Sequence, residues 1–229
     1  MPRAIIVGAS RGLGLGLVEE FARRGWEVLG TVRNEASAPE LGQLALGGKA
    51  RVEQLDVTDR ASAERLRDLL KDEPPLDLLF MNAGVGHPRG KTVLTASDDE
   101  AWTQFRTNAV GSVRTAEILV DLVRPDQGVV AFMTSRLGSV ADKTSDHADL
   151  YSASKAALNS LTRSFTARHA GKGLSVLSLH PGWVRTELGG DGAPIEVEDS
   201  VPGLADIVEK ARGTGRHAFL DYKGQTLPW

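Results

Sequence analysis

The sequence predicts an α/β fold, a doubly wound domain whose parallel sheet has about seven strands covered by helices on both faces. Two observations lead to this prediction. Short apolar runs rich in β-branched residues alternate with longer segments at helical period. Several of these runs end in small or polar residues, where open parallel sheets bind their ligands. No repeat or linker divides the 229 residues, so we expect one domain over residues 1–229.

Composition excludes several function classes. The net charge is −3 and no basic run is present, so we expect no nucleic-acid partner. The chain has no cysteine, which excludes disulfides, thiolate metal sites and cysteine nucleophiles. Its five histidines show no metal-ligand spacing, so we expect no metal. No window approaches the ~18 apolar residues of a membrane span, and we expect a cytoplasmic protein.

A glycine turn follows the first expected strand. We expect the strand over residues 4–7 and a helix over residues 15–24. The turn between them has the spacing G-x-x-x-G-x-G. Glycines let the backbone approach a pyrophosphate, and a helix N-terminus attracts negative charge. Strand, turn and helix therefore predict a Rossmann-type dinucleotide site, the alternative being a tight turn that binds no ligand. The turn residues concerned are Gly8, Ser10, Arg11, Gly12, Leu13 and Gly14.

An arginine follows the second expected strand, residues 27–32. An acidic residue at this point of a Rossmann unit binds a ribose 2′-hydroxyl, whereas an arginine accommodates a 2′-phosphate. Arg33 occupies the position, and Arg11 in the glycine turn can close on the same phosphate. The pair favours NADP over NAD.

The third strand is expected over residues 50–57, with a helix to residue 71 and a fourth strand over residues 76–81. Asp56 lies at the end of the third strand, where it is either a ligand-binding residue or a turn and capping residue. Asn82, Ala83 and Gly84 form a small-residue turn directly after the fourth strand.

A long helix is expected over residues 98–123, with Asn108 in its middle. Because asparagine is a weak helix former, Asn108 is either a chance surface residue or placed for a hydrogen bond. The fifth strand, residues 128–134, leads directly to Ser135.

A polar loop over residues 141–149 precedes a helix over residues 151–168 that opens on Tyr151 and Lys155. Side chains four residues apart share a helix face, so a phenol stands beside an ammonium. An adjacent positive charge favours the phenolate, and a tyrosine so placed can exchange a proton with an alcohol or carbonyl oxygen. The spacing alone is common on ordinary helices.

The remaining elements are a strand over residues 174–179, a helix over residues 200–211 and a strand over residues 216–220. Between them, the glycine-rich residues 185–197 predict a mobile flap and not a packed element.

Taken in order, the glycine turn, Asn82-Ala83-Gly84, Asn108, Ser135, Tyr-x-x-x-Lys and Pro181-Gly182 resemble the short-chain dehydrogenase/reductase family over essentially the whole chain. Residues 134–139, 180–186 and 227–229 are similar to its branch of sniffer-type carbonyl reductases and C-factor-like proteins.

The resemblance implies a catalytic tetrad of Asn108, Ser135, Tyr151 and Lys155. The family serine usually stands twelve or thirteen residues before the tyrosine, whereas Ser135 stands sixteen before it and Ser139 twelve. We choose Ser135 because it directly follows the fifth strand, and Ser139 stays the alternative. The expected cofactor-binding residues are Gly8, Ser10, Arg11, Gly12, Leu13, Gly14, Arg33, Asp56, Val57, Asn82, Ala83, Gly84, Tyr151, Lys155, Pro181, Gly182, Val184 and Thr186.

The function implied is NADPH-dependent reduction of an aldehyde or ketone. Ser135 would stabilise the carbonyl oxygen, Tyr151 would donate the proton, Lys155 would lower the pKa of Tyr151 and bind the nicotinamide ribose, and Asn108 would hold a water. Two alternatives stay open: an NADP-linked alcohol dehydrogenase working in the oxidative direction, and a non-catalytic NADP-binding regulatory or signalling protein. The family implies a homodimer or homotetramer. The substrate is not predicted.

Overall fold

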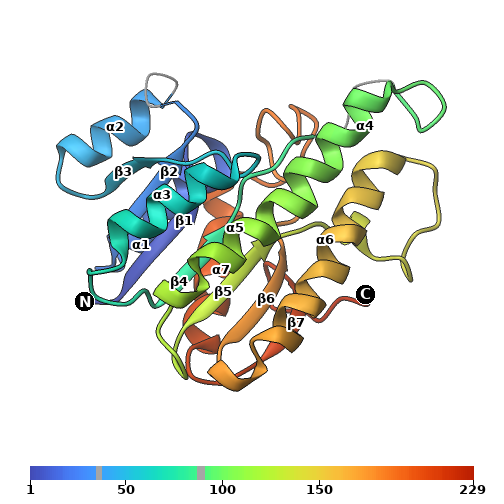
Figure 1. Ribbon diagram of the computed structural model, residues 1–229. Coiled ribbons are helices and arrows are strands. Elements are labelled where there is room, and N and C mark those ends of the chain that lie inside the picture. Colours follow the sequence, from blue (N-terminus) through green and yellow to red (C-terminus); the bar gives the residue numbers. More distant parts are fainter. Residues whose placement is uncertain (35–37, 87–90) are drawn as a thin grey trace.

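Seven parallel strands form one sheet in the order β3-β2-β1-β4-β5-β6-β7 (Figure 1). The computed structural model describes residues 1–34, 38–86 and 91–229. The strands are β1 Arg3–Val7, β2 Glu27–Val32, β3 Arg51–Gln54, β4 Leu78–Met81, β5 Val129–Met133, β6 Ser175–His180 and β7 His217–Asp221. The expected α/β class with a parallel sheet is confirmed.

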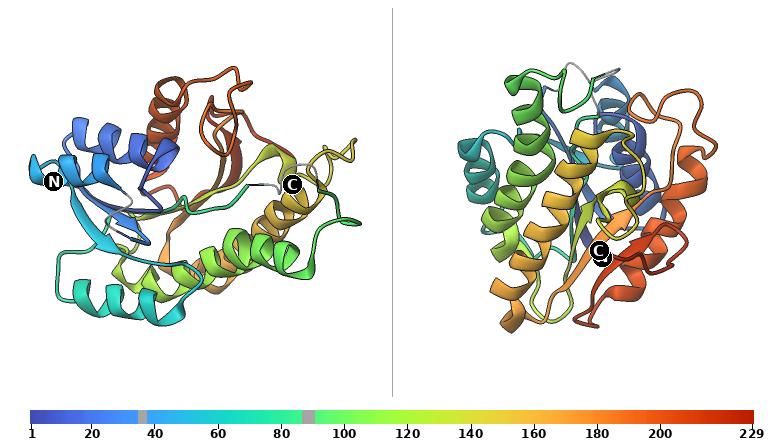
Figure 2. Two further views of the ribbon diagram at one scale, coloured as in Figure 1. Left: turned by 90° about the horizontal axis from the view of Figure 1, so that it is seen from above. Right: turned by 90° about the vertical axis from the view of Figure 1, so that its right-hand side faces the viewer.

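Helices cover both faces of the sheet (Figure 2). The α-helices are α1 Gly12–Arg23, α2 Pro39–Leu46, α3 Arg60–Leu70, α4 Asp98–Phe105, α5 Ser112–Leu119, α6 Asp149–Arg168 and α7 Val197–Ala211. Helices α1, α2 and α7 pack on one face, and α3, α5 and α6 on the other. Within the described ranges, no helix is both long and apolar enough to cross a membrane.

Strand side chains alternate between two core clusters. On β1, Ile5 and Val7 pack with the α3, α5 and α6 side, whereas Ala4 and Ile6 pack with the α1 and α7 side. Parallel strands buried on both faces read as continuous apolar runs, which is why these runs could be recognised in the sequence.

Strand register places the candidate residues at one edge of the sheet. Val7 pairs with Met81, Met81 with Phe132, and Met133 with Leu179, so β1, β4, β5 and β6 end side by side. The sheet order changes direction between β1 and β4, and ligands of such sheets bind in the crevice outside this point.

The expected helix over residues 98–123 is confirmed, although not all of its turns are α-helical. It consists of α4, a π-helical turn Arg106–Gly111, α5 and a 3-10 turn Val120–Leu122. The π turn lies against the segment that follows β3: a Cβ on Gly111 would stand 2.6 Å from the Val57 carbonyl oxygen. The helix α2 was not predicted, β3 ends at Gln54, and α7 begins at Val197, earlier than expected.

Because Gly111 has no space for a side chain, we expect Gly111→Ala to lower the free energy of unfolding by about 1–3 kcal/mol through overpacking. Urea denaturation measures this change. Gly42→Ala is the matched control, since Gly42 lies in α2 with nothing within 4 Å of an added Cβ. There alanine should leave stability equal or raise it by up to about 1 kcal/mol. Equal effects at the two positions would contradict the packing argument.

Candidate active site

The glycine turn after β1 is closed by backbone contacts. Gly8 has φ +85°, and a Cβ there would stand 2.7 Å from the Ala83 Cα. A Cβ on Gly14 would stand 2.0 Å from the Gly8 carbonyl oxygen, which already accepts a hydrogen bond from Asn82 Nδ2 at 2.7 Å. The turn therefore requires glycine at both positions. It presents the N-terminus of α1, where the Arg11 side chain makes no capping bond to the described residues.

Two arginines expected near a cofactor phosphate lie exposed at this edge. Ala9 N donates to Thr31 O at 2.8 Å, which joins the glycine turn to the end of β2, where Arg33 follows. The Arg11 guanidinium forms an ion pair of 2.9 Å with Glu187, a partner that the sequence did not reveal. The other turn residues, Ser10 and Leu13, are half-buried.

Asp56 is a turn residue, one of the two alternatives left open. Its Oδ1 accepts hydrogen bonds from the Thr58 backbone N and the Thr58 hydroxyl, both at 2.8 Å. Val57 beside it is 5% exposed and belongs to the core on the α3 side.

Asn108 is fully buried in the π turn and is not a surface residue. Its Oδ1 accepts from Val85 N at 2.8 Å, and its Nδ2 donates to Val85 O at 3.0 Å and to Ser154 Oγ at 3.0 Å. Asn108 therefore joins the segment after β4 to α6, the helix that carries Tyr151. π turns often occur at functional sites.

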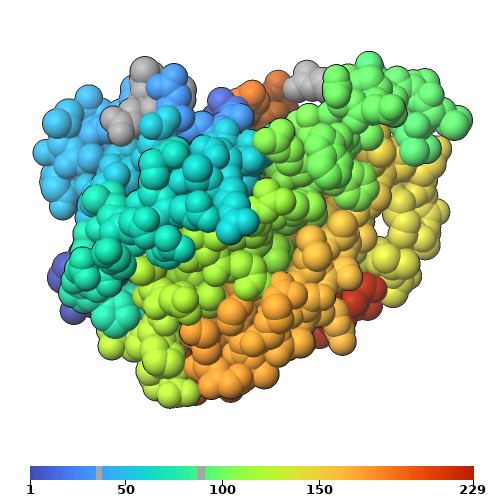
Figure 3. All heavy atoms as spheres, viewed as in Figure 1, coloured from blue at the N-terminus to red at the C-terminus, as the bar shows by residue number. Residues whose placement is uncertain are grey.

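The structure brings Ser135, and not Ser139, to Tyr151. A hydrogen bond joins the side chains of Ser135 and Tyr151. Ser139 is turned away: its Oγ accepts from Asp142 N at 3.1 Å and donates to Trp229 O at 3.5 Å. The three or four extra residues before the tyrosine are taken up by the polar loop, which forms the edge of the molecule beside α6 (Figure 3, yellow). In that loop Lys143 Nζ donates to Ser152 Oγ at 3.1 Å.

Tyr151 and Lys155 stand one turn apart near the start of α6, with the Lys155 Nζ 5.7 Å from the centroid of the Tyr151 ring. Lys155 is 4% exposed, and its Nζ donates to Met133 O at 2.9 Å. Burial lowers the pKa of Lys155 to about 8. Burial also raises the pKa of Tyr151 to about 12, against a smaller lowering by the Ser135 hydrogen bond. The expectation that Lys155 lowers the pKa of Tyr151 is wrong, and the phenol is protonated at neutral pH.

The segment after β6, which its glycines predict to be a mobile flap and not a packed element, does make packing contacts. Arg185 N donates to Ile195 O at 2.8 Å, and Ala193 is fully buried. Thr186 reaches the glycine turn, because a Cβ on Gly12 would stand 3.2 Å from its Cγ2. Of the other expected cofactor residues, Pro181 and Val184 are buried, and Gly182 has φ +87°.

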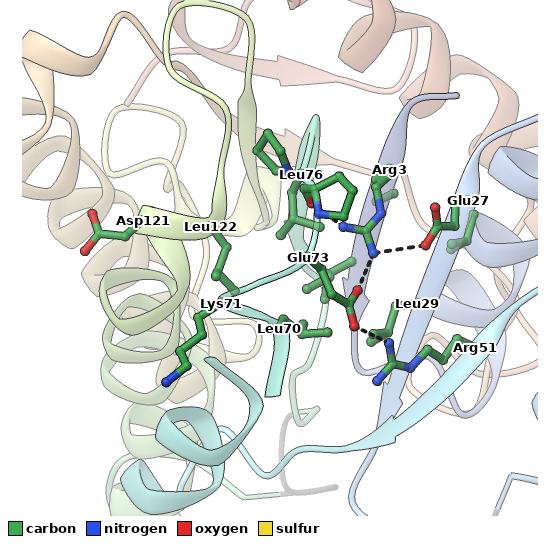
Figure 4. Close-up of a pocket in the computed structure, with 15 residues that line it drawn as sticks. Arg3, Glu27, Leu29, Arg51, Leu70, Lys71, Glu73, Leu76, Asp121 and Leu122 are labelled. Carbon is green, nitrogen blue, oxygen red and sulfur yellow. Dashed lines mark hydrogen bonds and ion pairs between the residues drawn. The ribbon is translucent and has the colours of Figure 1, made fainter. Parts of the chain in front are cut away.

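A separate cavity of about 150 Å³ opens at the opposite edge of the sheet, near the beginnings of β1, β2 and β3 (Figure 4). Its arginines are already paired: Arg3 with Glu27 at 2.9 Å and Arg51 with Glu73 at 2.7 Å. Among the described residues, no group of three or more acidic or histidine side chains is placed to hold a metal. The candidate active site is therefore the carboxyl edge of the sheet.

Comparisons with known proteins agree with the motifs. The sequence model of a family described as short chain dehydrogenase matches residues 2–193. C-signal of Myxococcus xanthus is 37% identical over 158 residues, which cover 68% of this chain and 93% of that protein.

Solved structures resemble the whole chain. A carbonyl reductase from Pseudomonas aeruginosa PAO1 in complex with NADP superposes with a TM-score of 0.92 at 42% identity, covering 100% of both chains. Carbonyl reductase Sniffer of D. melanogaster superposes with a TM-score of 0.89 at 29% identity, also over 100% of both chains. The similar proteins thus agree with the branch expected from the sequence, that of sniffer-type carbonyl reductases and C-factor-like proteins.

The buried ammonium of Lys155 makes stability depend on pH. Folding lowers the pKa of Lys155 from 10.5 to about 8, so between these values the unfolded chain binds more protons and stability rises with pH. At about 1.4 kcal/mol per pKa unit, the gain is up to about 3 kcal/mol. Lys155→Met keeps the apolar stem and should raise the free energy of unfolding at pH 7 by a similar amount.

Urea denaturation of wild type and Lys155→Met at pH 7 and pH 10 measures this effect, and the difference between the two proteins should shrink at the higher pH. Lys71→Met, at an exposed lysine that ends α3, is the control and should change stability little at either pH. A Lys155→Met protein less stable than wild type at pH 7 would contradict the argument.

Proposed function

The chain belongs to the short-chain dehydrogenase family, and we propose that it is an NADP-dependent oxidoreductase that reduces an aldehyde or ketone carbonyl to an alcohol. One observation carries the proposal. A protonated tyrosine is hydrogen-bonded to Ser135 and stands one helical turn from a buried lysine, at the carboxyl edge of a parallel sheet. This set combines a proton donor, an oxyanion partner and a positive charge.

The residues of the glycine turn fit a dinucleotide. Gly8 and Gly14 leave no room for side chains because the turn packs tightly on Ala83 and on itself, and the N-terminus of α1, which attracts negative charge, lies next to them. Arg33, with no carboxylate before it, and Arg11 would hold a 2′-phosphate. The similar carbonyl reductase from P. aeruginosa PAO1, which is in complex with NADP, supports the same cofactor here.

Bound NADPH supplies a hydride, and the chain supplies position, charge and a proton. The Ser135 hydroxyl would donate a hydrogen bond to the substrate carbonyl oxygen, where negative charge develops. Tyr151, whose phenol is protonated at neutral pH, would donate the proton to that oxygen. Lys155, charged at neutral pH, would offset the negative charge left on the phenol. Asn108 would hold α6 against the segment after β4.

Exposed apolar side chains lie on the segments that carry these groups. Leu137 follows Ser135 by two residues, Leu188 meets Gly86, and Trp183 is 58% exposed after Pro181-Gly182. Carbonyl compounds with apolar substituents are therefore the substrate class we propose. The homodimer or homotetramer stays a prediction.

The similarity to C-signal is the observation that favours the second candidate, a non-catalytic NADP-binding regulatory or signalling protein. The two candidate functions predict different outcomes in one experiment. A regulatory protein binds NADPH but consumes none with any of a panel of aldehydes, ketones and quinones, whereas an oxidoreductase consumes it with at least one.

Removing the proton donor tests the mechanism. Tyr151→Phe deletes one oxygen and should lower the turnover number by at least about 100-fold. The dissociation constant for NADPH should change less than about twofold, because the ring and Lys155 stay in place. NADPH oxidation with an aromatic aldehyde measures turnover, and titration by fluorescence measures binding. Tyr222→Phe, at the other tyrosine of the chain, is the matched control and should retain turnover. Retained reductase activity in Tyr151→Phe rules out the assignment.

The two arginines should determine cofactor choice. Because a charge-assisted bond to phosphate contributes about 1.5–3 kcal/mol, Arg33→Ala and Arg11→Ala should each raise the KM for NADPH at least about tenfold. The KM for NADH, which has no 2′-phosphate, should change little. Arg65→Ala, at an exposed arginine on α3, is the control. A wild-type preference for NADH would contradict the role given to both arginines.

A further inference from the structure

Helix α6 carries a third inward-facing polar residue in the same series as Tyr151 and Lys155. Asn159 follows Lys155 by four residues, so the three side chains share one helix face. Asn159 is 4% exposed. Its Oδ1 accepts a hydrogen bond from Thr134 Oγ1 at 2.8 Å, and its Nδ2 donates to Gly138 O at 3.2 Å.

These two partners lie on either side of Ser135. Thr134 precedes it, and Gly138 ends the 3-10 turn Arg136–Gly138 that Ser135 begins. The Ser135 Oγ is oriented within this turn, since it accepts from Leu137 N at 3.1 Å. Gly138 also lies directly on α6, because a Cβ there would stand 2.8 Å from the Lys155 carbonyl carbon. Residues 134–138 are called the serine turn below. Asn159 thus hydrogen-bonds to both ends of the serine turn and links it to the helix that carries Tyr151.

We propose that Asn159 is a positioning residue that holds the Ser135 hydroxyl in register with the Tyr151 phenol. The inference rests on the proposed function, in which both hydroxyls act on one carbonyl oxygen. Two groups that share one oxygen must keep their separation, and misplacement by about 1 Å can cost about 100-fold in rate. The Thr134 contact fixes the strand side of the turn, and the Gly138 contact fixes its far side.

Asn159→Asp is the sharpest variant, because the shape and the acceptor for Thr134 stay while the donor to Gly138 O is replaced by a second acceptor. We expect the turnover number to fall about 10- to 100-fold. The dissociation constant for NADPH should change less than about twofold, since Asn159 lies behind the serine turn. In a Ser135→Ala background, Asn159→Asp should change turnover less than about threefold, because the group it positions is already absent.

Thr162→Val is the matched control. Thr162 is fully buried on the same helix, and its Oγ1 donates to Leu158 O at 2.8 Å, within α6 itself. This variant removes a buried hydrogen bond without touching the serine turn, so it should lower the unfolding temperature but leave turnover within about twofold of wild type.

A spectroscopic measurement decides the proposal even without turnover. The chain has two tyrosines, so after Cζ labelling with carbon-13 the Tyr151 resonance is assigned by comparison with Tyr222→Phe. The resonance should move in the same direction in Ser135→Ala and Asn159→Asp, because both disturb the hydrogen bond between Ser135 and Tyr151, and stay in place in Thr162→Val. An unmoved resonance in Asn159→Asp overturns the inference, as does an equal loss of turnover with and without Ser135. If the wild type consumes no NADPH but the resonance moves as expected, the proposed function fails while the positioning role stands.

Discussion

The burial of the Lys155 ammonium against the carbonyl oxygen of Met133 is the interaction on which the site depends. A charge held away from water is costly, so its hydrogen-bonding partner must lie close. Helix α6 lies directly on the turn that follows β5, because a Cβ on Gly138 would stand 2.8 Å from the Lys155 carbonyl carbon. The absence of a side chain at Gly138 therefore allows this close approach of helix and turn, and with it the place of Tyr151.

Much of the fold and of the candidate site could be predicted, because short stretches of sequence determine the strands and the spacing of side chains on α6. Strands buried on both faces appear as apolar runs, and the parallel order brings Gly8, Asn82 and Ser135 to one edge of the sheet. The four-residue spacing on α6 places Tyr151 beside Lys155 whatever surrounds them. The choice of Ser135 over Ser139 also rested on a local rule, the position directly after a buried strand.

The rest depends on contacts between distant segments, which residue spacing does not encode. The π turn around Asn108 packs at Gly111 against the carbonyl of Val57, more than fifty residues earlier in the chain. Ser139 is removed from the site by Trp229, ninety residues further along the chain. The pKa of Tyr151 was predicted in the wrong direction, because the sequence shows the neighbouring lysine but not how far the surrounding segments exclude water.

The ion pair between Arg11 and Glu187 has a consequence for cofactor exchange. The Arg11 guanidinium cannot make its full set of hydrogen bonds to a carboxylate and to a phosphate at the same time. A phosphate bound there as proposed therefore competes with Glu187, in the loop after β6, for this guanidinium. By thermodynamic linkage, the phosphate then loosens the loop contact by the same factor by which that contact weakens the phosphate. The two side chains are 65% and 68% exposed, and such pairs contribute at most about 1 kcal/mol, or about fivefold in affinity. This ion pair would therefore adjust the release of the proposed cofactor only slightly.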